Sequence, residues 1–131
     1  MAGSFSDYLE TKLLDHTFRN TSFTSPSGVY LALFTSAPTD AGGGTELSGN
    51  AYVRQSITMA TSGTSPTLCT NSSAVEFPTA TASWGTLVAV GIFDASSSGN
   101  MLAWADLASN RTVGSGDIFR VPANDLDITL A

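Results

Sequence analysis

The sequence predicts one mainly β domain, an antiparallel β-sandwich or jelly roll of about seven to eight strands with a single N-terminal helix. Sustained helical periodicity lies within residues 1–20, and short apolar segments recur through residues 28–131. Gly, Ser, Pro and Asn separate these segments at close intervals, as in sandwiches and barrels rather than βαβ folds. A length of 131 residues is usual for one domain, and no linker divides the chain. We therefore treat residues 1–131 as a single domain.

The segment SFSDYLETKLLDHTFRN predicts the helix. Ser4 and Asp7 fit an S-x-x-D capping box, and Asp7 and Glu10 place negative charge at the positive end of the helix dipole. Asn20 is a suitable residue to end the helix. Apolar residues at helical spacing form one stripe: Phe5, Leu9, Leu13, Leu14 and Phe18. We expect the domain's own sheet to bury this stripe, with another subunit as the alternative.

The strands are predicted from apolar runs bounded by turn residues. Residues 28–36, GVYLALFTS, are apolar on both alternating faces, which is typical of a strand covered on both sides. Residues 61–72 read as a loop or edge segment, while Gly85 and Gly91 indicate bulges or close backbone approach. Turns are expected at 96–100 and 112–117. The expected strands are residues 28–36, 51–59, 74–77, 81–95, 101–107, 118–122 and 126–130.

The charge pattern argues against several classes of partner. Only 12% of residues are charged, the formal net charge is −6, and the five basic residues are scattered: Lys12, Arg19, Arg54, Arg111 and Arg120. The basic run or stripe of a nucleic-acid-binding protein is missing, and an anionic membrane would repel the chain. We therefore expect neither nucleic acid nor membrane as a partner. Low charge also suits a surface hidden in an assembly, because interface cores are depleted in charged residues.

Cys69 is the only cysteine, which leaves no intramolecular disulfide and no metal site built from cysteines. We expect it to behave as a small buried apolar side chain. The N-terminal residues lack the basic and apolar regions of a signal peptide. No apolar run approaches the roughly 18–20 residues that span a bilayer. These features predict a soluble protein made in a reducing compartment.

No set of residues predicts catalysis. His16 is the only histidine, and we interpret it as a helix-end residue that suits the dipole. A nucleophile elbow is absent, and a Cys69–His16 pair has no local signature. Two of the 11 acidic residues could form a glycosidase pair, although most lie in turns or at alternating strand positions. Asp94 and Asn100 read as hairpin-turn residues because their spacing does not match a calcium loop. We expect no enzyme activity, cofactor or metal.

The segment LFTSAPTDAGGGTEL, residues 33–47, contains three consecutive glycines. No Lys-Ser/Thr and no helix start follow them, so the phosphate-binding patterns are absent. Asp40 and Glu46 would also repel a phosphate. A Gly-rich excursion of roughly 15 residues between strands supplies reach, and such long loops are often functional. We interpret this segment as a contact loop.

The order of five segments resembles a family of small bacteriophage virion proteins with a tail-fibre-like label. These segments are YLETKLLDHTF, VYLALFTSAPTDAGGGTEL, AYVRQ, WGTLVAVGIFDASSSGNMLAWADL and GDIFRVPANDLDITL. The resemblance covers nearly the whole chain, and its most specific parts are the second and fourth segments. It implies a structural role and carries over no catalytic residue. Conspicuous positions are therefore expected to determine the fold: Trp84, Gly85, Gly91, Asp94, Gly99 and Asn100.

Some proteins that this resemblance brings together are jelly-roll cement or decoration proteins of phage heads. The resemblance therefore implies a cement protein on the capsid surface, made in the bacterial cytoplasm. It would clamp major capsid subunits and form a homo-oligomer, a dimer or a trimer. A tail or tail-fibre component is the alternative. A carbohydrate-binding module is more remote, with Tyr30, Tyr52, Trp84 and Trp104 as stacking residues. The candidate interface comprises Phe5, Tyr8, Leu9, Asp40, Gly42, Gly43, Gly44 and Glu46.

Overall fold

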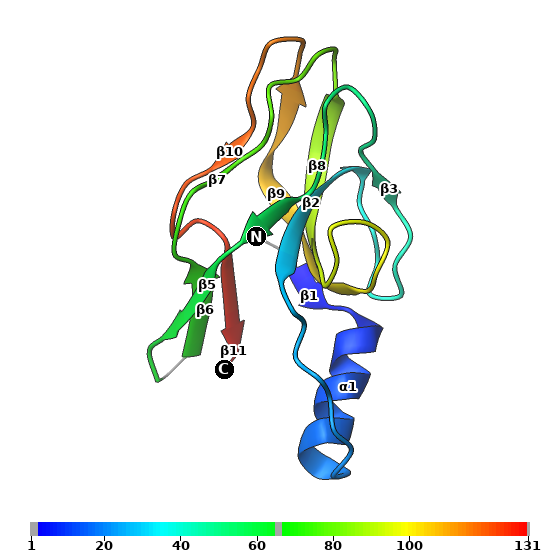
Figure 1. Ribbon diagram of the computed structural model, residues 1–131, viewed down its shortest axis with the longest axis vertical. Coiled ribbons are helices and arrows are strands. Elements are labelled where there is room, and N and C mark those ends of the chain that lie inside the picture. The colour runs from blue at the N-terminus through cyan, green and yellow to red at the C-terminus, as the bar shows by residue number, and fades with distance from the viewer. Residues whose placement is uncertain (1–2, 65–66, 131) are drawn as a thin grey trace.

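The computed structural model of the protein describes residues 3–64 and 67–130. It confirms a mainly β, antiparallel fold with one N-terminal helix (Figure 1). The elements in chain order are β1 (Gly3–Phe5), α1 (Asp7–Phe18), β2 (Val29–Ser36), β3 (Thr45–Glu46), β4 (Gln55–Ile57), β5 (Met59–Ser62), β6 (Thr67–Asn71), β7 (Val75–Glu76), β8 (Gly85–Phe93), β9 (Met101–Val113), β10 (Arg120–Val121) and β11 (Asp127–Leu130). Several of these strands are only two or three residues long, which explains why fewer were expected.

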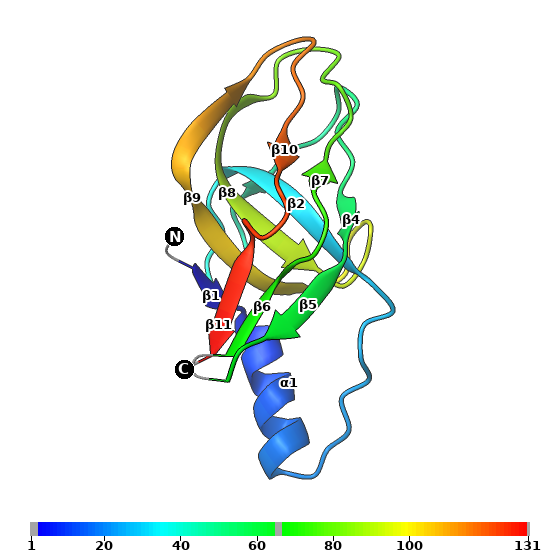
Figure 2. The same ribbon diagram turned by 90° about the vertical axis from the view of Figure 1, so that its left-hand side faces the viewer.

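The strands form two layers around one core (Figure 2). The larger layer is a six-stranded sheet with the order β1-β9-β8-β2-β3, in which β4 also pairs with β2. Two small sheets, β10-β7 and β11-β6-β5, make the other layer. Leu31 and Leu33 of β2 are fully buried and belong to the same apolar cluster as Phe77 and Leu126 of the second layer. Burial of this cluster between the layers holds the sandwich together.

The six-stranded sheet is apolar on its outer face as well, as residues 28–36 predicted. Ala32 and Phe34 of β2 are buried there, and the Phe34 ring stacks on Phe93 at a centroid distance of 6.3 Å. Gly91 lies beneath these rings, because a Cβ atom at that position would come within 2.9 Å of Phe34 Cε1. The prediction of close approach at Gly91 is therefore confirmed.

Several strand boundaries differ from those predicted. The strand expected at 51–59 begins only at Gln55, because Tyr52 and Arg54 turn toward Glu46. The interpretation of 61–72 as a loop or edge is wrong for β6, which is the central strand of its sheet; residues 65 and 66 lie outside the described residues. Cys69 of this strand is half-buried rather than buried. The strand expected at 101–107 extends to Val113, which pairs with Gly85, so the following turn starts later.

The helix begins two residues later than its sequence predicted. Ser4 and Phe5 belong to β1, where they pair with Trp104 and Ala103 of β9. Ser6 is the N-cap, and its hydroxyl accepts a hydrogen bond from the Leu9 amide at 3.2 Å. The capping box at Ser4 is therefore wrong, because pairing with β9 keeps that residue extended.

The apolar stripe of the helix is not buried as expected. Tyr8 and Leu9 pack on the core, but α1 buries none of its residues fully. The exposed fractions of Leu14 and Phe18 are 58% and 79%, because α1 points away from the sheet beyond its first turns (Figure 1). Asn20, in the left-handed conformation with φ of 59°, lies just beyond the Arg19 C-cap, as predicted. In the described part of the chain, no helix could cross a membrane.

Asn71 connects the β6 sheet to the chain that enters β11. Its fully buried side-chain amide donates to the carbonyls of Ser73 and Pro122, and its Oδ1 accepts from the Leu126 amide, all at 2.9 Å. Two segments about 50 residues apart in the sequence, 71–73 and 122–126, are therefore joined by one polar side chain.

Replacing Asn71 should destabilise the fold sharply. We expect Asn71→Leu to lower the free energy of unfolding by about 2–4 kcal/mol, because backbone groups would be left buried without partners. Asn110 is exposed, so Asn110→Leu is the matched control and should change the free energy of unfolding by less than about 0.5 kcal/mol. Urea denaturation of both variants measures this difference, and equal effects would contradict the assigned role.

Candidate interaction surface

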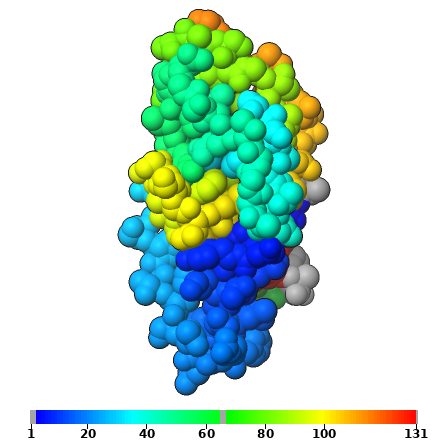
Figure 3. Space-filling model, turned by 90° about the vertical axis from the view of Figure 1, so that its right-hand side faces the viewer, coloured from blue at the N-terminus to red at the C-terminus, as the bar shows by residue number. Residues whose placement is uncertain are grey.

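The predicted interface residues lie around the N-terminal half of α1 and the glycine-rich loop. This loop, residues 37–54, and the loop of residues 94–100 lie side by side above the helix (Figure 3). A hollow of about 340 Å³ separates them from the first turn of α1. Among the predicted residues, Gly43 and Gly44 are exposed, whereas Phe5, Tyr8, Leu9, Asp40, Gly42 and Glu46 are half-buried.

Asp40 holds the glycine-rich loop against the rest of the domain through two hydrogen bonds. Its carbonyl accepts a hydrogen bond from the Asp7 amide at 2.9 Å, and its Oδ1 accepts one from the Trp104 indole at 2.8 Å. The helix, the loop and β9 therefore meet at this residue.

The three glycines allow a tight turn. Gly42, Gly43 and Gly44 have φ angles of 100°, 80° and 73°, which are strained for other residues. Thr39 and Gly42 exchange backbone hydrogen bonds of 2.8–2.9 Å across the turn. At Gly44 a Cβ atom would also lie 2.6 Å from the Ser36 carbonyl oxygen, whereas Gly42 and Gly43 face open space. Conformation explains all three glycines, and only the exposed face of the turn is available for contact.

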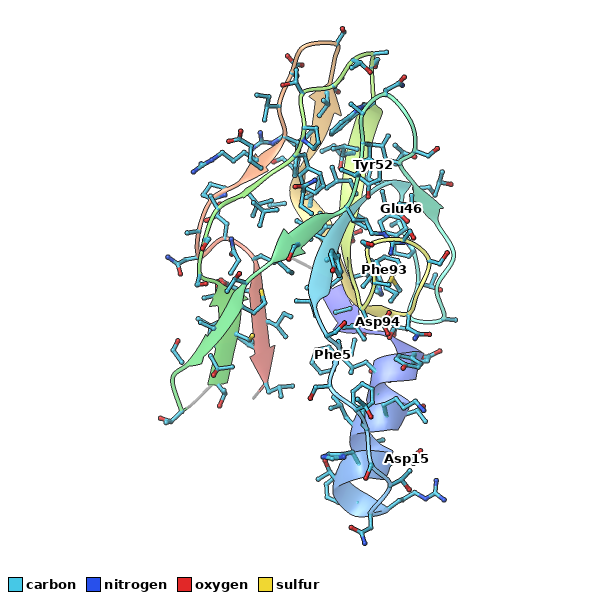
Figure 4. The ribbon with its side chains drawn as sticks, in the orientation of Figure 1. Phe5, Asp15, Glu46, Tyr52, Phe93 and Asp94 are labelled. Atoms are coloured by element: carbon cyan, nitrogen blue, oxygen red, sulfur yellow. The ribbon has the colours of Figure 1, made fainter. Side chains whose placement is uncertain are left out.

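Glu46 forms the charged centre of this region (Figure 4). Arg54 donates to both carboxylate oxygens, with Nη2 2.7 Å from Oε1 and Nε 2.8 Å from Oε2. Tyr52 also donates its hydroxyl to Oε2 at 2.8 Å, and that hydroxyl accepts from the Leu33 amide. Such a bidentate pair is among the stronger side-chain interactions.

The pKa values reflect this environment. Burial acts to raise the pKa of Glu46, but the hydrogen bonds from Arg54 and Tyr52 and the charge of Arg54 outweigh it, so the pKa lies below its ordinary value of 4.5. Burial raises the pKa of Tyr52, and the hydrogen bond to the Glu46 carboxylate adds to that rise. The hydrogen bond to Glu46 raises the pKa of Arg54. At neutral pH the cluster is therefore a fixed ion pair.

Arg54 also joins the two loops. Its Nη1 donates to the carbonyls of Ala95 and Ser98 at 2.9 and 2.8 Å, and its guanidinium lies 3.7 Å from the Phe93 ring centroid. Asp94 closes the second loop by accepting from the backbone and side-chain amides of Asn100. The hairpin-turn interpretation of Asp94 and Asn100 is confirmed. The importance of Arg54 was not predicted from the sequence; the available signal was an acid, Glu46, followed eight residues later by an arginine.

The aromatic residues considered for sugar stacking divide into two groups. Trp84 is 3% exposed, and its indole donates to the Asn50 carbonyl at 2.9 Å. Tyr52 stacks on Phe77 within the core, so neither Trp84 nor Tyr52 offers a free face. Tyr30 and Trp104 are half-buried.

The residues considered for chemistry are dispersed. His16 Nδ1 accepts a hydrogen bond from the Phe23 amide at 3.1 Å, which ties the helix to the chain leading into β2. No three His, Cys, Asp or Glu residues within 3–64 and 67–130 gather as a metal site would require.

An apolar groove opens at the side of the sandwich where the two layers diverge. It has a volume of about 310 Å³ and lies between β1, β9 and β8 on one side and β11 on the other. Ile92 and Leu126 line its buried part, and Leu130 and Glu10 lie at its exposed margin. This groove continues the core toward solvent.

The described chain is thus a small antiparallel β-sandwich with one projecting helix. Comparison with protein families matches residues 4–129 to the family described as "Podophage GP4 fiber I protein gp80". Because this match covers nearly the whole chain, the protein belongs to that family of phage virion structural proteins. The search of curated proteins gave no match.

The Glu46–Arg54 pair should contribute to stability in a pH-dependent way. We expect Glu46→Gln to lower the free energy of unfolding by about 1–3 kcal/mol at neutral pH, because the guanidinium loses its charged partner. Since the folded-state pKa of Glu46 is lowered, this contribution is complete above its ordinary value of 4.5 and declines as the pH falls through the folded-state pKa. Glu76→Gln is the control, because its side chain is 60% exposed and 3.9 Å from Arg120. Chemical denaturation across this pH range tests the difference, and a pH-independent effect would contradict it.

The neighbouring glycines should respond differently to alanine. We expect Gly43→Ala to lower the free energy of unfolding by about 1 kcal/mol, through its left-handed φ alone. Gly44→Ala should lower it by about 2–4 kcal/mol, because the methyl group also meets the Ser36 carbonyl. Thermal and urea unfolding of the pair measures this order, and the reverse order would contradict the assigned geometry.

Proposed function

We propose that this protein is a component of a phage tail fibre, in which the β-sandwich is a rigid, non-enzymatic module held to a virion neighbour by its helical end. The observation that carries the proposal is the match of residues 4–129 to a family described as a fibre protein. No part of the proposal requires a catalytic group.

The geometry supports a rigid module with one attachment end. Asp40 and Arg54 tie the glycine-rich loop to α1, β9 and the 94–100 loop through hydrogen bonds. The helix, by contrast, leaves Leu14 and Phe18 largely exposed. Apolar side chains gathered on one projecting element mark a contact surface rather than ordinary solvent-facing surface. In a fibre this end would be covered by another virion chain, and the protein would act as a homo-oligomer.

A capsid cement protein that clamps neighbouring major capsid subunits is the second candidate. Its support is that the described strands form no elongated repeat and that α1 has only 12 residues. A low share of charged residues, 12%, suits contact with many shell subunits. Both roles are structural, and they differ in the partner and in the position on the virion.

The position of the protein on intact virions tests these two roles. With gold-labelled antibodies against the purified protein, we expect label on the fibres at the tail and none on heads separated from their tails. Regular label over the head surface would support the cement role and contradict the fibre role. Absence of label from the whole particle, with the protein absent from purified virions by mass spectrometry, would contradict both.

A further inference from the structure

We propose that an extended segment of a neighbouring virion protein, with apolar side chains at alternate positions and basic ones between them, adds as a strand along the free edge of β11 and fills the groove between β11 and β1. The inference rests on the proposed function, because it names the chemistry of the chain that holds the helical end of the module. Three features of this side of the sandwich carry it: unpaired strand edges, an alternating apolar face and an acidic rim.

Two strands at this side of the sandwich have an unpaired edge. β1 ends the six-stranded sheet, and β11 ends the three-stranded sheet. The two strands lie next to each other across the groove (Figure 2), and no backbone hydrogen bond joins them in the described part of the chain. In an antiparallel pair, every second residue points its N–H and C=O groups away from the partner strand. A free edge of this kind is a template for another strand.

The free edge of β11 faces the groove. All four residues of this strand, Asp127–Leu130, line the groove. Successive side chains of a strand point to opposite faces, so a surface that touches every residue in turn runs along the strand's edge. An added strand would therefore lie in the groove itself, with main-chain hydrogen bonds to β11, as in other cases of strand addition.

The inner face of β11 suits a strand with alternating apolar side chains. Leu126 and Ile128 contact the core, and Leu130, which follows on the same face, is 60% exposed. The groove beside them has a volume of about 310 Å³, and Phe5 of β1 and Ile92 of β8 are among its lining residues. This volume is at the lower end of the usual range of pockets, about 300–1,000 Å³, which suits one or two inserted side chains. Every second side chain of an added strand would be covered there.

The rim of the groove is acidic. Asp127, on the other face of β11, and Glu10 of α1 are exposed lining residues, and none of the described residues that line the groove is basic. Neither carboxylate takes part in an ion pair within residues 3–64 and 67–130. Oppositely charged residues directly across an antiparallel pair stabilise it, so a Lys or Arg between the apolar positions of the added strand would pair with Asp127.

A second copy of this chain does not offer such a segment. The sequence has five basic residues, and each lies in or at the end of an element or is held by an acid. Lys12 lies in α1, Arg19 caps its C-terminus, Arg54 binds Glu46, Arg111 lies in β9 where it pairs with β8, and Arg120 lies in β10 where it pairs with β7. The basic strand is therefore supplied by a different virion chain.

Titration of the purified full-length chain with a model peptide tests the strand addition. The probe is a blocked peptide of about eight residues in which arginine alternates with valine, long enough to cover β11. By NMR we expect the amide signals of β1 and β11 to shift and hydrogen exchange of the β11 amides to slow, because hydrogen bonds protect amides from exchange. Unchanged signals of both strands at about 1 mM peptide would overturn the inference.

Two control peptides separate strand addition from simple attraction to an acidic chain. N-methylation of the central residues removes the main-chain donors and keeps the charge, and we expect it to weaken binding by about tenfold or more. Replacing the arginines by glutamates should weaken binding similarly, because like charges then face Asp127 across the strands. Equal affinity of the N-methylated peptide would overturn the strand addition, and equal affinity of the glutamate peptide would overturn the basic character of the occupant.

A pair of matched double variants tests the acidic rim. We expect Glu10→Gln with Asp127→Asn to weaken binding of the arginine–valine peptide by about three- to tenfold. The control is Asp7→Asn with Glu76→Gln, which removes the same charge from the first turn of α1 and from β7, and it should bind normally. Circular dichroism checks that both variants remain folded. Equal weakening by the two would contradict a role for the rim.

Photo-crosslinking on assembled virions identifies the donor of the strand. Benzoylphenylalanine replaces Leu130 in one sample and Ile118, which is 51% exposed and precedes β10, in the control. We expect the cross-link from position 130, and not that from position 118, to reach a segment of another virion protein with basic residues between apolar ones. A segment without basic residues would overturn the inference. The fibre assignment would then still stand, because the antibody position on virions tests it independently.

Discussion

The inner face of the six-stranded sheet has to be covered, and the way in which it is covered determines the arrangement of most other strands. Leu31, Leu33 and Val90 lie on that face, and burying each of them stabilises the fold by about 1.5–3 kcal/mol. The cover consists of two small sheets made of short strands, held in place by Asn71 and by the connections around it. These sheets diverge from β1 and β9 at one side, and the groove is the part of the core that they leave open.

The helix lies outside this core and depends on local interactions. A helix of 12 residues is marginal in water by itself. The Ser6 cap, the Asp15–Arg19 pair at 3.0 Å and the contact of Tyr8 with Phe23 support it. None of these interactions covers Leu14 or Phe18. The apolar stripe of α1 is therefore only partly covered when one chain folds.

The spacing of apolar residues predicted those elements in which buried residues recur regularly along the chain. Residues 28–36 are apolar on both faces because the main core lies on one side and the small cluster around Phe34 on the other, and residues 29–36 form β2. The strand β6 was missed because Thr67 and Thr70 give it a polar composition, and its central position comes from pairing with both β5 and β11. Single-sequence patterns carry no information on such distant pairing. The same limit hid the role of Arg54, whose partners Ala95 and Ser98 lie more than 40 positions along the chain.

One end of the molecule is held by hydrogen bonds between its own turns, whereas the helical end leaves apolar side chains exposed. At the end opposite α1, the turns bind one another: the Asn50 side chain donates to the Ser83 carbonyl, and the Gly116 amide donates to the Ala80 carbonyl. The Trp84 indole also donates there, so these turns keep their shape without a partner. At the helical end, by contrast, Leu14 and Phe18 remain largely exposed to water. In the proposed fibre role, α1 is the attachment end, and the turns that bind one another lie at the opposite end of the molecule (Figure 1).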